Sequence, residues 1–146
     1  MSVTTAQWFA KSGGNLIARL WVPQQMGVML MKPSFVPDID TQMAYADVAA
    51  QEVAAGGGYT VGGKQITGRS IVYNAGSDQW DMLGDDVVWG PGATFSTRYG
   101  IVYEMATAEK YLWELLDFGS QVDIANGNFT VDFSAAVLAV AAGPPV

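Results

Sequence analysis

The second half of the chain is a succession of short segments rich in β-branched and aromatic residues, each bounded by turn residues. These segments are RSIVYN (69–74), QWDML (79–83), DVVWG (86–90), TFSTRYGIVYEM (94–105), YLWELLDF (111–118) and NFTVDFS (128–134). Between them stand AGSD, GD, GPGA and NGN, which favour tight turns. Strands at a spacing of about ten residues, without a long helix between them, are typical of an antiparallel β-sandwich or jelly roll. The sequence therefore predicts a mainly all-β fold.

Two segments before residue 59 add to this prediction. In residues 26–31, MGVMLM, an extended chain would place Met26, Val28 and Leu30 on one side and Met29 and Met31 on the other. Apolar residues on both sides predict a strand buried on both faces. Residues 40–53 are rich in helix formers, and Asp40 is expected to cap the helix that they form. The glycines at 56–58 end it. We expect one short helix near residues 40–53, lying over the edge of a sheet.

The organisation predicted is an N-terminal arm followed by one domain. Residues 1–14 carry the aromatic pair Trp8 and Phe9 before Ser12-Gly13-Gly14, which predicts a flexible arm. Residues 15–146 are expected to form a single domain, because no composition shift divides them and no repeat of useful length is present. An arm with exposed aromatic residues is expected to dock on its own domain or on a neighbour.

Composition limits the classes of function. The chain has 146 residues, no cysteine and no histidine, so thiolate chemistry and the commonest general base and metal ligand are absent. The net charge of −7 argues against a nucleic-acid partner. No apolar run of about 18 residues is present, and the first residues lack the pattern of a secretory signal. We expect folding in the cytoplasm and no membrane partner.

The low total charge points to contacts with other subunits. Only 14% of the residues are charged, whereas soluble domains usually carry about 25%. A small domain of this kind has either a polar uncharged exterior or a surface that other subunits cover. We favour the second interpretation.

The segment GGGYTVGGKQ (56–65) contains the pattern G-x-x-x-x-G-K of a phosphate-binding loop. Such a loop needs a Ser or Thr after the lysine to bind magnesium, but Gln65 follows Lys64. It must also open a helix, and the β-branched residues after Gln65 favour a strand. We interpret the segment as a turn that leads into a strand, with no cofactor.

Other chemical sites are less favoured than structural roles. Asp78, Asp81, Asp85 and Asp86 could bind calcium, but their spacing does not match a calcium loop, and a solvated turn is favoured. The acidic residues Glu104, Glu109, Glu114 and Asp117 could supply a glycosidase pair, although nothing in the sequence brings them together. The five tryptophans and six tyrosines could form a sugar platform, but the strand-like surroundings of Trp80, Trp89 and Trp113 favour core packing, whereas Trp8 and Trp21 are less anchored. We predict no catalytic, cofactor or metal residues.

Three characteristic pieces follow one another along the chain: YTVGGKQIT, then GDDVVWG followed by FSTRYGIVYE, then LLDFG followed by NGNFTVDF. Over about residues 20–140, this order of features resembles a family of small virion proteins of tailed bacteriophages. It implies a β-rich structural protein, of which capsid decoration or cement proteins are examples. The chain departs from the family in its N-terminal arm and in MATAEKYLWELL, where lattice-specific contacts are expected.

The function predicted is that of a capsid decoration protein, without enzymatic activity, on the outside of an icosahedral head. Its expected partners are the major capsid protein and itself, as a dimer or trimer. The residues expected at the interface are Trp8, Phe9, Trp21, Tyr111 and Trp113. A tail or head-fibre component that adheres to host glycans is the alternative, and a carboxylate-based hydrolase is a more remote one.

Overall fold

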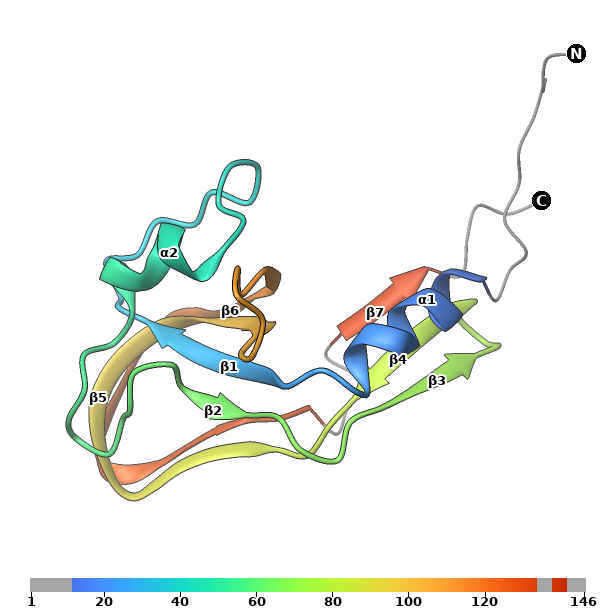
Figure 1. The fold of residues 1–146 in the computed structure, drawn as a ribbon. Helices are drawn as coiled ribbons and strands as arrows, with labels where there is room; N and C mark the ends of the chain where they lie inside the picture. Colours follow the sequence, from blue (N-terminus) through green and yellow to red (C-terminus); the bar gives the residue numbers. More distant parts are fainter. Residues whose placement is uncertain (1–11, 134–137, 142–146) are drawn as a thin grey trace, which may run out of the picture.

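The computed structural model describes residues 12–133 and 138–141. Two antiparallel sheets contain its strands (Figure 1). The four-stranded sheet has the order β2-β1-β5-β6, with β1 at Met26–Met31, β2 at Lys64–Gln65, β5 at Val87–Glu104 and β6 at Leu112–Val131. The three-stranded sheet has the order β3-β4-β7, with β3 at Ser70–Asn74, β4 at Gln79–Leu83 and β7 at Leu138–Ala141. The prediction of a mainly β, antiparallel fold is confirmed.

The hairpin of β5 and β6 dominates the large sheet. Both strands bend back on themselves, so that the sheet encloses much of its own core (Figure 1). The register between them shifts between Trp89 and Ala93, and again at three later positions. Register shifts increase the bend and twist of a ladder. Segments that we predicted as four separate strands are therefore two long ones, because GPGA and NGN lie inside the bent hairpin instead of ending its strands.

The small sheet extends the molecule beyond one end of the large sheet (Figure 1). It does not stack over the large sheet, and the finer prediction of a sandwich or jelly roll is not confirmed. Helix α1, Ser12–Trp21, packs against β3 and β7. The predicted arm boundary at residue 14 therefore falls inside a helix, and residues 1–11 lie outside the described part of the chain. No helix among the described residues is long and apolar enough to cross a membrane.

The end of α1 is held by an arginine that is distant in sequence. The Arg69 side chain donates from Nε to the carbonyl oxygen of Trp21 at 2.8 Å and from Nη2 to that of Gln24 at 2.5 Å. The last carbonyl groups of a helix have no partner within it, and a cation is favoured beside them. The Trp21 indole donates to the backbone oxygens of Ser70 and Leu83, at 3.0 and 3.2 Å. These contacts join α1 to the small sheet.

Strand β1 contributes to both hydrophobic clusters. Met26, Val28 and Leu30 belong to the inner cluster, which the bent sheet encloses. Met29 and Met31 belong to the outer cluster, on the other face of the sheet. The outer cluster also contains Phe35, Val48, Ile101 and Tyr103. All six residues of β1 are buried, which confirms the predicted strand with two buried faces.

The helix expected at residues 40–53 is shorter than predicted. Helix α2 occupies only Tyr45–Val48 and is followed by a single 3-10 turn, η1, at Ala49–Gln51. Asp40 does not cap it. The N-cap residue is Ala44, whose side chain forms no cap hydrogen bond, and the Asp47 carboxylate accepts hydrogen bonds from the backbone amides of Met43 and Ala44, both at 2.9 Å. Figure 1 shows α2 beside one end of β1, where it covers the outer cluster.

The glycine-rich segment is a tight loop followed by β2, as predicted. Its amides do not converge on an open site, because the Gly62 amide donates to the Glu52 carboxylate at 2.6 Å. Lys64 donates to the backbone oxygen of Val88 at 2.6 Å. A side chain at Gly63, which has a φ of 68°, would collide with the backbone oxygen of Val28. The glycines thus allow the loop to lie directly against β1.

Candidate interaction surface

The five predicted interface residues have different surroundings. Trp8 and Phe9 lie outside the described residues. Trp21 is fully buried in the inner cluster, so this expectation is corrected: its ring already packs against the domain and presents no surface to a partner. Tyr111 is 43% exposed, and Trp113 is partly buried beside the inner cluster. Both of these lie where β6 begins.

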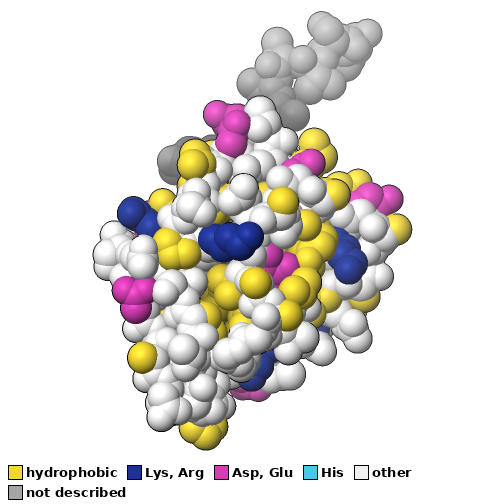
Figure 2. All heavy atoms as spheres, turned by 90° about the vertical axis from the view of Figure 1, so that its left-hand side faces the viewer, with side chains coloured by type: hydrophobic (Ala, Val, Ile, Leu, Met, Phe, Trp, Pro, Cys, Tyr) yellow, Lys and Arg dark blue, Asp and Glu magenta, His cyan; other side chains and the backbone are white. Residues whose placement is uncertain are grey.

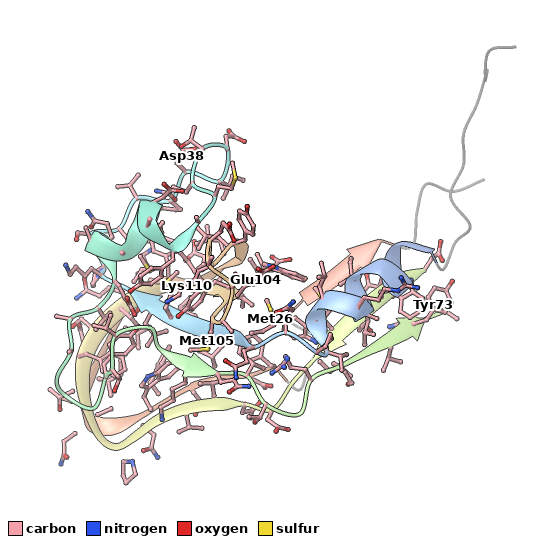
Figure 3. All side chains as sticks on the ribbon, in the orientation of Figure 1. Met26, Asp38, Tyr73, Glu104, Met105 and Lys110 are labelled. Carbon is pink, nitrogen blue, oxygen red and sulfur yellow. The ribbon has the colours of Figure 1, made fainter. Side chains whose placement is uncertain are left out.

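Close to Tyr111 is a loop with exposed apolar side chains, residues 33–44, which we call the apolar loop. Val36, Ile39 and Met43 in it are 76, 78 and 65% exposed. The loop is internally ordered, since the Asp38 carboxylate accepts from the Thr41 hydroxyl at 2.6 Å. Figure 3 places Asp38 on the part of the loop that projects from the body. A rigid loop that holds large apolar groups in water is typical of a contact surface.

Sequence reasoning missed this loop. Pro33 and Pro37 disrupt regular secondary structure in this segment. The usable signal was the combination of these prolines with Val36, Ile39 and Met43 in a segment without apolar periodicity, because such residues cannot all face a core. Figure 2 shows the face that carries α2 and the bend of β5, where hydrophobic side chains gather among scattered charged ones.

Among the described residues, the outer edge of β6 is unpaired over most of its length. At its start, the Leu112 amide donates to the backbone oxygen of Met43 at 2.9 Å, and Ala44 bridges Tyr111. Beyond Leu112, β6 pairs only with β5 among the described strands. A long unpaired edge presents backbone donors and acceptors to any extended segment that reaches it. The apolar loop and the open edge are therefore adjacent.

Two hollows line this edge and share Glu114 and Leu115. The first, of about 120 Å³, lies between β6 and the apolar loop. Its lining residues are Phe35, Pro37, Asp38, Ile39, Gln42, Ile101, Leu112, Trp113, Glu114 and Leu115. The second, of about 360 Å³, lies between the two ends of β6 and is formed by residues 114–118 and 130–132. We call the second hollow the β6 groove.

Glu114 is a partly buried carboxylate in the β6 groove. Among the described residues it forms no ion pair and no side-chain hydrogen bond, and burial raises its pKa above the ordinary value for a glutamate. Asp117, farther along the groove, lies 3.7 Å from the guanidinium of Arg98. Removing a carboxylate from water without a compensating cation is unfavourable. The groove thus contains a charge that a cationic ligand would stabilise.

Glu104 and the other acidic residues outside the groove either accept hydrogen bonds from the protein or are exposed to solvent. Glu104 is buried and accepts a hydrogen bond from the Trp113 indole at 3.0 Å. Glu52 is also buried, and its carboxylate accepts a hydrogen bond from the Gly62 amide of the glycine-rich loop. Within the described ranges, no group of three or more acidic side chains could bind a metal ion. Asp78, Asp81, Asp85 and Asp86 are not brought together into such a group.

The chain was compared with known proteins by sequence and by structure. No family model matches it, no curated protein is similar to it, and no solved structure resembles it.

Proposed function

We propose that the chain is a virion structural protein of a tailed bacteriophage that decorates the outside of the capsid. The observation that carries this proposal is the apolar loop, which holds Val36, Ile39 and Met43 in solvent on an ordered backbone. Burying such residues against a shell would contribute about 25 cal/mol for each Å² of apolar surface. The resemblance of the sequence to small virion proteins supports the same role.

The proposed mechanism is stabilisation by selective binding. A protein that binds only the assembled lattice shifts the equilibrium towards that lattice by the free energy of the new contacts. The low content of charged residues, 14%, suits a chain whose surface is largely covered after assembly. The major capsid protein is the proposed partner of the apolar loop.

Binding to phage heads tests the proposal. Purified chain is added to heads assembled without it, unbound protein is removed by sedimentation, and the particles are imaged by electron cryomicroscopy. We expect density on the outer surface of the head, with the apolar loop facing the shell. Density on the tail alone, or no binding at saturating concentrations of the chain, would contradict the proposal.

A carboxylate-based hydrolase is a second candidate, because Asp38 and Glu114 line the same hollow. Burial raises the pKa of Glu114, whereas hydrogen bonds from Thr41 lower that of Asp38. Acid and base pairs of glycosidases have pKa values separated in this way. The hollow of about 120 Å³ is smaller than the roughly 300–1,000 Å³ of most ligand sites, which favours the structural role. Glycoside hydrolysis that disappears in Glu114→Gln would reverse this preference.

A further inference from the structure

The β6 groove combines an open strand edge, apolar side chains and an unpaired carboxylate. Glu114, Leu116 and Phe118 stand at every second position of the strand, so that the three side chains point to the same face. Leu116 is buried in the inner cluster, and Phe118 is partly buried against it. The groove is therefore suited to an antiparallel extended segment in which a large apolar residue precedes a cation by two positions.

Charge is distributed unevenly along the chain. Residues 1–37 contain the basic residues Lys11, Arg19 and Lys32 and no acidic residue, whereas all 14 acidic residues follow. The β6 groove, in contrast, is lined by three acidic residues, of which Asp117 is paired with Arg98 and Glu114 has no ion pair or side-chain hydrogen bond among the described residues. The N-terminal segment and the groove therefore have complementary charge.

The sequence of residues 1–11 matches the pattern that the groove requires. In MSVTTAQWFAK, Phe9 precedes Lys11 by two positions, so both side chains would lie on one face of a strand. If this segment pairs antiparallel to β6 with Lys11 beside Glu114, Phe9 lies beside Leu116. Eleven extended residues span on the order of 35 Å, which is enough to follow β6 through the groove.

The position of α1 favours a groove on another molecule. The helix begins at Ser12, at its end farther from β1, and packs against the small sheet (Figure 1). The chain before Ser12 therefore starts at the opposite side of the small sheet from the large sheet that carries the groove. A segment that starts there is well placed to reach a neighbouring copy.

We propose that residues 1–11 of one copy add as an antiparallel strand to the open edge of β6 in a second copy, with Lys11 paired to Glu114. The added strand satisfies backbone groups along the edge, and Phe9 covers Leu116. Head-to-tail exchange of this kind links copies in a ring or a chain. The inference does not depend on a capsid, so its test is independent of the proposed function.

The first test is self-association of the full chain by sedimentation equilibrium. We expect oligomers, and a dissociation constant raised about tenfold or more by either Lys11→Glu or Glu114→Lys, because each places like charges together. The double variant Lys11→Glu with Glu114→Lys should recover most of the affinity. Glu109→Lys is the matched control, since Glu109 is exposed outside the groove, and it should leave association unchanged.

The second test separates exchange between copies from binding within one copy. Chains labelled with ¹⁵N are mixed with unlabelled chains, and carboxylates are coupled to amines by a carbodiimide. We expect cross-linked peptides that join Lys11 of one label to Glu114 of the other. A monomeric full chain, cross-links within single labels only, or failure of the double variant to recover association would overturn the proposal.

Discussion

The hydroxyl of Tyr59 donates to the carboxylate of Glu52 at 2.6 Å, in a region where both side chains are buried. The same carboxylate accepts from Tyr45 at 2.7 Å and from the Gly62 amide at 2.6 Å. Burial and the bond to Glu52 raise the pKa of Tyr59 well above its ordinary value. One acidic residue thus holds η1, the glycine-rich loop and α2 on the sheet.

Replacing Glu52 by alanine should destabilise the fold by about 3 kcal/mol or more, because several buried donors lose their acceptor. Urea unfolding measures this change. Tyr45→Phe removes a single, partly buried hydrogen bond and should cost about 1 kcal/mol. Equal effects of the two substitutions would show that Glu52 does not organise the network.

Gly63→Ala should destabilise the protein by more than about 2 kcal/mol. The backbone at this position has a φ of 68°, and the added methyl group would meet the backbone of β1. The control is Gly76→Ala in an exposed turn, where the nearest atom would be 3.4 Å from the new group. Thermal unfolding of both variants provides the comparison, and a Gly63→Ala protein as stable as the control would exclude close packing of the loop.

Val36→Asp and Ile39→Asp should weaken binding to phage heads about tenfold or more, because each places a charge in the proposed contact. Their unfolding free energies should stay within about 0.5 kcal/mol of the parent, since both side chains are largely exposed. Val72→Asp, at a half-exposed position of β3, is the matched control. Loss of head binding in Val72→Asp but not in the other two variants would place the contact surface elsewhere.

The pKa of Glu114 leads to a prediction about pH. Burial raises the pKa of the Glu114 carboxyl group in the folded state. As pH rises, this group therefore loses its proton at a lower pH in the unfolded chain than in the folded one. Stability therefore decreases between the unfolded and the folded pKa, and the penalty remains at neutral pH. Glu114→Gln should remove it and increase stability at pH 7, by less than about 1 kcal/mol because the group is partly solvated.

The increase from Glu114→Gln should disappear below pH 4, where the carboxyl group is protonated in both states. Unfolding is measured at concentrations at which the chain is monomeric, with Glu109→Gln as the exposed control. A stability gain that does not depend on pH would assign the effect to packing instead of charge.

Much of the fold could be predicted because local residues determine it. β3 and β4 occupy the predicted segments almost residue for residue, since β-branched and aromatic residues lie between clear turns. The continuity of β5 through Gly90-Pro91-Gly92 could not be predicted, because its bend depends on pairing with β6. Helix α1 was missed for a related reason: Arg69, which holds its end, is 48 positions away from Trp21.

The candidate surface could be predicted only in part. Tyr111 and Trp113 lie at the start of the open edge, and their place at an interface stays a prediction. The position of Glu114 between two hollows depends on the register shift between Val102 and Tyr103 and on the return of β6 to its own beginning. Neither property has a local sequence pattern.

Both walls of the β6 groove come from one strand and the residue after it, since residues 114–118 and 130–131 of β6 and the adjoining Asp132 line the same hollow. The width of the groove is therefore set by the curvature of β6, to which the register shifts with β5 contribute, two of them next to the lining residues Glu114 and Asp117. A change at the shift between Thr97 and Tyr99 would alter the separation of the walls without replacing any residue in them. The fit of a ligand in the groove therefore depends on the geometry of the β5–β6 hairpin.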